Sequence, residues 1–230
     1  MSRYAIYYAP DRDSALWRAG VCWLGRDPET REIVAPPAID GLAPARQRQI
    51  TESPRRYGWH GTLKAPFALS PGVAVDDLVA EMQRFCARRE PFPLPPLAVG
   101  VVDGFIAVVP SRGSVILDDL AAACVECFDP FRAPMTATER SRRLGASLSE
   151  RQLDYLERWG YPYVMDEYRF HMTLTGRLPA LDQAALLPWL ERHFAAALQR
   201  PVPVHDIALY EEPAPGDALR LLRRVGFSGG

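Results

Sequence analysis

Two histidines stand in the same short pattern in the two halves of the chain. The letters HGTL occupy residues 60–63 and HMTL occupies residues 171–174, so each motif has a hydroxyl two residues after an imidazole. On a β-strand, residues i and i+2 share a face, and each motif therefore presents both groups together. One imidazole can act as base while a second, protonated one acts as acid, and threonine hydroxyls can donate to phosphate oxygens. The pattern predicts phosphodiester cleavage or transfer without a metal ion or another cofactor, and a small phosphorylated substrate.

Three further residues fall on the same predicted strand faces. Lys64 and Thr175 come four residues after the histidines, and Arg169 precedes His171 by two. A lysine and an arginine beside a phosphate are chemically sensible, so all three are candidate substrate-binding residues. For Lys64 and Arg169 the alternative is a solvated charge on a strand.

Several other residues near the motifs are expected to be structural. Trp59 and Phe170 fall on the opposite strand face, which predicts core packing rather than a stacking platform for a base. His193 lies in a predicted helix and His205 in a late strand, and both are expected to have structural roles.

The elements that position the motifs alternate along the chain. Strands are expected at residues 4–9, 58–69, 97–102, 105–109, 169–177, 202–210 and 218–226. Helices are expected at residues 15–24, 44–52, 75–89, 114–128, 149–159 and 182–198. Asp103-Gly104 predicts a tight hairpin between two of the strands.

This order repeats, which predicts an internal duplication. Pro-x-Arg-x-Ser follows the first predicted strand at residues 10–14 and recurs one hundred residues later, at 110–114. The repeat halves are residues 1–103 and 104–230, within a single bilobal domain spanning 1–230. The predicted fold class is α/β (α+β), with a sheet in each lobe, helices on its outer face and the site in a central cleft.

The paired motifs resemble those of the two-histidine (2H) phosphoesterase superfamily. The stretches YGWHGTLKAPF at residues 57–67, and WGYPY at 159–163 leading to RFHMTLT at 169–175, are similar to an uncharacterised branch associated with phosphonate metabolism. The resemblance covers essentially the whole chain. It implies a bilobal fold in which His60 and His171 are the catalytic acid and base and Thr62 and Thr173 bind phosphate. Gly61 departs from the hydrophobic residue that usually follows each histidine in the superfamily.

Composition limits the alternatives. The chain has 230 residues with 27 basic and 28 acidic side chains, and this balance argues against a partner as extended as a long nucleic acid. An RNA-end 2′,3′-cyclic phosphodiesterase and a non-catalytic module that binds a phosphorylated ligand remain alternative functions. Cys124-x-x-Cys127 stands alone, so we expect helix thiols rather than a zinc site.

The expected setting is the cytoplasm. No apolar run approaches the roughly 20 residues of a membrane-spanning helix, and the N-terminal segment does not resemble a signal peptide. A monomer is the default expectation. Residues 129–143 contain prolines, threonines and the arginines Arg140, Arg142 and Arg143 among others, and we expect either a flap over the cleft or a solvated loop.

Overall fold

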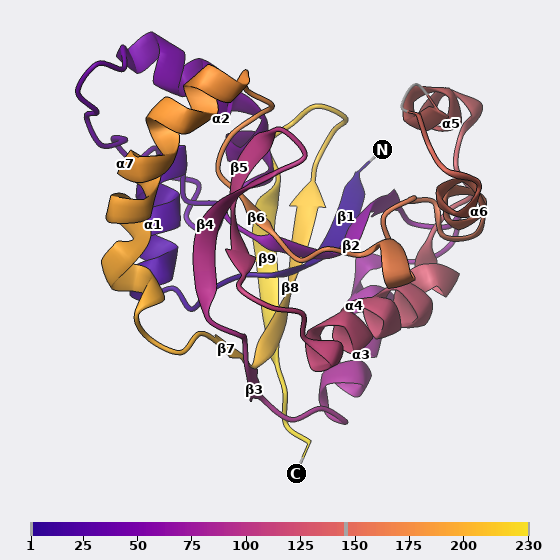
Figure 1. Cartoon of the computed structure of the whole chain (residues 1–230). Helices are drawn as coiled ribbons and strands as arrows, with labels where there is room; N and C mark the ends of the chain where they lie inside the picture. Colours follow the sequence, from indigo (N-terminus) through magenta and orange to yellow (C-terminus); the bar gives the residue numbers. More distant parts are fainter. Residues whose placement is uncertain (1, 145–146, 230) are drawn as a thin grey trace.

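The strands form antiparallel sheets at the centre of the molecule (Figure 1). The computed structural model describes residues 2–144 and 147–229. One sheet has the strand order β2-β1-β8-β9, a second has the order β4-β5-β6, and β3 pairs with β7. The strands are β1 (Arg3–Tyr8), β2 (Gly61–Ala68), β3 (Phe92–Pro93), β4 (Leu97–Val102), β5 (Phe105–Pro110), β6 (Met172–Thr173), β7 (Pro203–Val204), β8 (Asp206–Glu212) and β9 (Arg220–Gly226).

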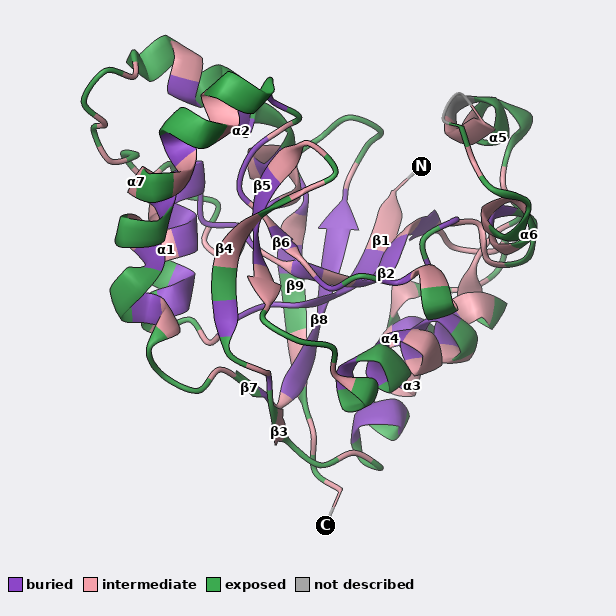
Figure 2. Ribbon diagram, in the orientation of Figure 1, coloured by how far each residue is buried: buried purple, intermediate pink, exposed green. Residues whose placement is uncertain are grey.

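Helices cover both sheets, and the predicted mixed α/β architecture is confirmed. The helices are α1 (Ala15–Leu24), α2 (Pro44–Tyr57), α3 (Val75–Cys86), α4 (Val115–Phe128), α5 (Ala137–Leu144), α6 (Glu150–Trp159) and α7 (Ala180–Leu198), with short 3-10 turns η1 (Asp129–Phe131) and η2 (Met165–Glu167). Helix α7 packs on β4 and β5 and against α1, whereas α4 packs on β2 and α3 packs on β8 and β9. The outward faces of α2 and α7 are exposed, while β8 is buried along its whole length (Figure 2).

The two larger sheets share one pattern of strand order. In each, an inner strand opens one half of the chain: β1 in the first sheet and β5 in the second. On one side of it lies the strand that follows a histidine, which is β2 or β6. On the other side lies a later strand that belongs to the other half of the chain, which is β8 or β4. Each sheet therefore contains strands from both halves. Such an order would arise from a duplication in which β4 and β8 each joined the sheet of the other half. The duplication and its division at residue 103 stay predictions.

Serine caps explain why several helices begin where the sequence predicts. Ser14 and Ser114, the last residues of the repeated Pro-x-Arg-x-Ser pattern, accept hydrogen bonds from the backbone three residues later and begin α1 and α4. Ser149 and Gln152 form a capping box at the start of α6. The Asp103-Gly104 hairpin also forms, between β4 and β5.

Helix α2 is longer than predicted because a tertiary contact supports its last turn. Pro54 lies inside the helix and has no N–H to donate to the carbonyl of Ile50. That carbonyl instead accepts a hydrogen bond of 2.7 Å from the backbone N–H of Gly176. The helix can therefore continue to Tyr57 and reach the first histidine motif.

The strand predicted at residues 169–177 is wrong in its extent. Only Met172 and Thr173 pair with β5, and the chain then turns so that the N–H groups of Leu174 and Thr175 both donate to the carbonyl of Ile106. The segment at residues 129–143 also differs from a plain loop, because it contains η1 and most of α5.

Candidate active site

The two histidine motifs lie against each other although they are far apart in the sequence. His60 directly precedes β2 and His171 directly precedes β6. The ring of Phe170 occupies the space beside Gly61, where a Cβ atom would lie 2.4 Å from the ring. The hydroxyl of Tyr168 donates to the carbonyl of Thr62 at 3.0 Å. These contacts bring the edges of the two sheets together at the motifs.

Both imidazoles are held in the same way. Nδ1 of His60 lies 2.8 Å from the carbonyl oxygen of Gly58, and Nδ1 of His171 lies 2.8 Å from that of Arg169. Because a carbonyl can only accept, Nδ1 is the protonated nitrogen and Nε2 of a neutral ring is unprotonated. Nε2 of His60 accepts a hydrogen bond from the Thr62 hydroxyl at 3.2 Å. In both rings the Nδ1 atom is thus bound to the backbone, which leaves Nε2 as the nitrogen that can meet a ligand.

Burial keeps both imidazoles neutral at pH 7. The ring of His60 stacks on Tyr7, with centroids 3.8 Å apart. Burial lowers the pKa of His60 to about 4, against the opposing effect of the Gly58 carbonyl, and the neighbouring His171 lowers it further. Burial also lowers the pKa of His171, while the charge of Asp103 acts in the opposite direction. A bound anion would favour the protonated form of either ring.

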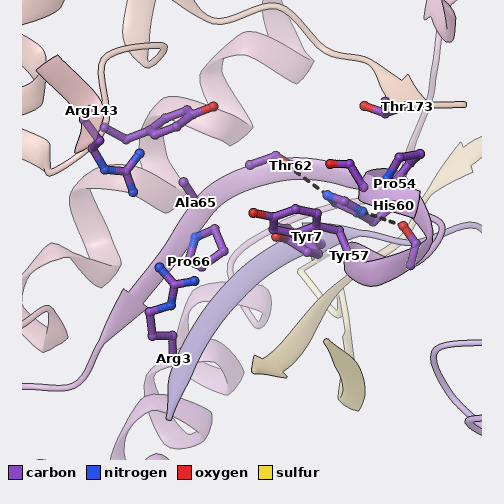
Figure 3. A pocket seen from close by; sticks show the side chains of 13 residues that line it. Arg3, Tyr7, Pro54, Tyr57, His60, Thr62, Ala65, Pro66, Arg143 and Thr173 are labelled. Atoms are coloured by element: carbon purple, nitrogen blue, oxygen red, sulfur yellow. Dashed lines mark hydrogen bonds between the residues drawn. The ribbon is translucent and has the colours of Figure 1, made fainter. Parts of the chain in front are cut away.

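The four motif residues line two adjoining cavities. His60, Thr62 and Thr173 line a cavity of about 360 Å³, part of which is drawn in Figure 3. His171 lines a second cavity of about 630 Å³, and Thr62 belongs to both. Tyr161 also lines both cavities. A small ligand bound at Thr62 would thus lie between the two histidines.

Lys64 does not lie with the histidines. The register of β2 against β1 shifts between Thr62 and Lys64, which adds a residue to β2 and reverses the face on which Lys64 points. Its side chain is 3% exposed, and its Nζ donates to the carbonyl of Val125 at 2.9 Å and to Asp129 Oδ1 at 3.1 Å. The parity argument for Lys64 was wrong, because it assumed a regular strand.

Of the other two candidates, one is structural and one borders the site. Thr175 is fully buried, and its hydroxyl accepts a hydrogen bond from the N–H of Ile106 at 3.0 Å. Because β6 ends at Thr173, Thr175 does not share a strand face with His171. Arg169 is exposed and lines the larger cavity beside His171. Its guanidinium donates to the carbonyls of Asp166 and Tyr168, and its own carbonyl orients His171.

Sequence reasoning missed a group of cationic and aromatic residues in the smaller cavity. These residues are Arg3, Tyr7, Tyr57, Arg143 and Tyr161. Tyr7 pairs directly with Thr62 across β1 and β2, so the two side chains share a face. The spacing of Arg3 and Tyr7 on β1 is visible in the sequence. It does not show that these side chains lie beside Thr62, because that depends on the pairing of β1 with β2. Nothing in the sequence places Arg143 at the cavity.

The residues predicted to be structural are packed as expected. Trp59 and Phe170 are buried in the core, 0% and 6% exposed. His193 stacks on Trp189 and lies 3.0 Å from the carbonyl of Ala19. Among the residues described, the cysteines are free thiols, and those of the Cys-x-x-Cys pair are buried or half-buried on α4.

One cluster outside the cavities has the donor atoms of a metal site. Asp11, His205 and Asp206 each place one such atom within 4.8 Å of the others. His205 Nε2 already lies 2.7 Å from Asp11, and the guanidinium of Arg224 lies 3.6 Å from Asp206. The donor atoms of Asp11 and Asp206 thus already have partners within the protein.

Fold and site define a mixed α/β protein with two equivalent histidine–threonine motifs where its sheets meet, in agreement with the two-histidine resemblance. The chain belongs to the family described as "Protein of unknown function (DUF1045)", which matches residues 62–220. In the described part of the chain, no helix is long and apolar enough to cross a membrane.

Two curated relatives are similar over most or all of the chain. Both are named "Ribose 1,5-bisphosphate phosphokinase PhnN". The protein from Janthinobacterium sp. (strain Marseille) is 38% identical over 100% of this chain and 51% of its own length. The protein from Laribacter hongkongensis (strain HLHK9) is 38% identical over 97% of this chain and 51% of its own length. The chain therefore spans about half the length of these relatives.

Solved structures with distant similarity include E. coli LigT complexed with 3′-AMP, at 15% identity and a TM-score of 0.44 over 98% of this chain and 99% of LigT. A conserved protein of unknown function from Agrobacterium tumefaciens, ATU0111, has 14% identity and a TM-score of 0.45 over 98% of this chain and 85% of that one. With identities of 15% and 14% and TM-scores below 0.5, these two similarities carry no inference about the function of this chain.

Proposed function

We propose that the chain is a phosphodiesterase that cleaves a small cyclic or ribose-linked phosphate ester with its two histidines. The observation that carries this proposal is the matched geometry of His60 and His171. Each imidazole is fixed through Nδ1 to a backbone carbonyl, which leaves Nε2 as the nitrogen that can exchange a proton with a substrate. A purely structural histidine has no need of an equivalent partner in an adjoining cavity.

The reaction would be an in-line displacement at phosphorus. A water oxygen attacks the phosphorus atom and gives its proton to Nε2 of the neutral imidazole. The bond from phosphorus to the leaving oxygen breaks, and that oxygen takes a proton from Nε2–H of the other imidazole. Thr62 and Thr173 donate to the non-bridging oxygens and stabilise the developing charge. Because the two rings supply both acid and base, these steps require no metal ion, and either histidine can serve as the base.

The substrate class is supported by the size of the site and by the names of the relatives. Cavities of about 360 and 630 Å³ suit a small molecule rather than an extended polymer. The curated relatives are named for a kinase of ribose 1,5-bisphosphate. A ribose phosphate ester, within phosphonate metabolism as the sequence resemblance implies, is therefore our preferred substrate.

Hydrolysis assays with purified protein test the proposal. A panel of cyclic ribose phosphates and nucleotide 2′,3′-cyclic phosphates is offered in the presence of EDTA. His60→Ala and His171→Ala should each lower kcat/KM by about 10²–10⁴-fold. His193→Gln, which changes a histidine packed against Trp189, is the matched control and should leave the rate unchanged.

Two other outcomes would point to different functions. If no panel member is hydrolysed but phosphate binds in a manner that depends on His60 and His171, the chain is a binding module. If an oligoribonucleotide ending in a 2′,3′-cyclic phosphate is cleaved much faster than the small esters, the substrate is an RNA end.

A further inference from the structure

The cavity that holds His60 is cationic at the end away from the histidine. Arg3 and Arg143 lie at one end of the pocket and His60 and Thr173 at the other (Figure 3). Among the described residues that line this cavity, none is an aspartate or a glutamate. By contrast, the cavity beside His171 is lined by Asp103 and Glu167 as well as arginines. The two sides of the candidate active site therefore differ in charge.

Arg3 contributes a positive charge that its ion pair does not cancel. Its Nε donates to Glu212 Oε2 at 2.5 Å, and Glu212 is fully buried. Arg56 binds the other oxygen of this carboxylate at 2.7 Å. Two guanidinium groups thus share the Glu212 carboxylate. Glu139 on α5 also lies close enough to Arg3 and Arg143 for both to lower the pKa of its carboxyl, so the guanidinium groups of Arg3, Arg56 and Arg143 face the two carboxylates of Glu139 and Glu212 and a net positive charge remains beside the cavity.

The hydroxyl groups of three tyrosines add hydrogen-bond donors. Tyr57 accepts a bond of 2.7 Å from Arg56 Nη2, so its own hydroxyl proton remains to be donated. Burial raises the pKa of Tyr7, and the nearby Tyr57 and Tyr161 raise it further, so Tyr7 stays a neutral donor. Tyr7 and Tyr57 direct their hydroxyls toward the end of the pocket where Arg3 and Arg143 lie (Figure 3).

Arg143 reaches the cavity from α5. Its guanidinium carbon lies 5.1 Å from the ring centroid of Tyr161, close enough for a cation–π contact. Tyr161 lines both cavities, and this contact holds the arginine over the smaller one.

We propose that Arg3, Arg143 and the hydroxyls of Tyr7, Tyr57 and Tyr161 form a second anion-binding subsite, so that the substrate carries a phosphate or phosphonate group in addition to the ester that is cleaved. Arginines and hydroxyl donors, in a cavity whose described lining residues include no aspartate or glutamate, are the chemistry that recognises such a group. This inference rests on the proposed function, because it assigns the reacting ester to the histidines. It names the substrate as an asymmetric molecule whose anionic end lies on the His60 side.

Binding and hydrolysis together test this subsite. Calorimetry compares ribose 1,5-bisphosphate with ribose 5-phosphate, and assays compare ribose 2,3-cyclic phosphate with and without a 5-phosphate. We expect the wild-type protein to favour the doubly phosphorylated member of each pair by about tenfold or more. Arg143→Gln should remove most of that preference, and Arg143→Lys should retain part of it. Arg140→Gln is the matched control on the same helix, since Arg140 pairs with Glu157 outside the cavity, and it should change neither preference.

The outcomes separate the two proposals. The subsite would be overturned if both cyclic esters were hydrolysed at the same kcat/KM, by the wild-type protein and by Arg143→Gln alike. The proposed phosphodiesterase activity would then still hold. A bisphosphate preference that depends on Arg143, without hydrolysis of any ester, would support the subsite and overturn the catalytic proposal. An equal effect of Arg140→Gln and Arg143→Gln would also overturn the subsite.

Discussion

The ring of Phe170 packs directly on Gly61, at a spacing that leaves no room for a side chain at residue 61. A Cβ atom there would lie 2.4 Å from the Phe170 ring. Each of these residues is the sequence neighbour of a candidate catalytic histidine, so the contact fixes one motif against the other. This explains why a glycine follows His60, where a hydrophobic residue is usual in the two-histidine superfamily.

Gly61→Ala should therefore separate the motifs and destabilise the fold. Overpacking of this kind costs about 1–3 kcal/mol, measured as the free energy of unfolding in urea. We expect kcat/KM on a cleaved ester to fall by about tenfold or more, since small misplacements of reacting groups are costly. Gly100→Ala is the control, because its added Cβ would meet Val109 at an ordinary 3.6 Å. Unchanged activity in Gly61→Ala would show that the contact does not position the histidines.

The pH dependence of hydrolysis should reflect the lowered pKa values of both histidines. Catalysis needs one protonated and one neutral imidazole, and the pKa of His60 is about 4 while that of His171 is below its ordinary value of 6.5. The active form becomes scarcer as the pH rises through this range, so kcat/KM should be highest below pH 6.5. A profile that rises to a plateau above pH 8 would contradict these assignments.

The lowered pKa of His60 also predicts how the free energy of unfolding changes with pH. An unfolded histidine binds a proton near pH 6.5, whereas folded His60 does so only near pH 4. Stability should therefore decrease as the pH falls from 6.5 toward 4. Urea unfolding at pH 7 and pH 5 measures this effect, and His60→Gln should show a smaller decrease than the wild-type protein.

The hydroxyls of Thr62 and Thr173 should contribute to binding of the reacting phosphate. Thr62→Val and Thr173→Val keep the side-chain shape, and each should lower kcat/KM by about 10–100-fold through one lost charge-assisted hydrogen bond. The matched serine variants retain the hydroxyl and should recover most of the rate. Serine variants as impaired as the valine variants would argue against phosphate contacts at these residues.

Lys64 should matter for stability and not for substrate binding. Asp129→Asn removes an anionic partner of a buried ammonium group and should cost about 3 kcal/mol of unfolding free energy. Lys64→Met in the same protein should restore much of this loss, because the buried ammonium group is then removed as well. Both variants should keep KM within about threefold of wild type, since a direct phosphate contact would give a larger change. A tenfold increase in KM for Lys64→Met alone would return Lys64 to the binding site.

Local signals in the sequence predicted most of the elements and the centre of the site. Ser14, Ser114 and the Asp103-Gly104 pair are caps and turns whose chemistry acts within a few residues, so their elements were predicted correctly. The motif residues were recognised because their pattern occurs twice. Lys64 was misplaced because a bulge in β2 depends on its pairing with β1, which alternation along one strand does not reveal.

Long-range contacts account for the remaining differences. The end of α2 depends on Gly176, which bonds the Ile50 carbonyl that Pro54 leaves without a donor. Arg3 and Arg143 line the same cavity although 140 residues separate them in the sequence, and only the folded structure brings them together.

A crystal structure of the protein soaked with inorganic phosphate tests the central claim most directly. The phosphate should lie between the two motifs, with its oxygens within hydrogen-bonding distance of Nε2 of His60 and of His171 and of the hydroxyls of Thr62 and Thr173. An ion that contacts only one histidine, or that binds only at the arginines, would contradict acid–base catalysis by the pair.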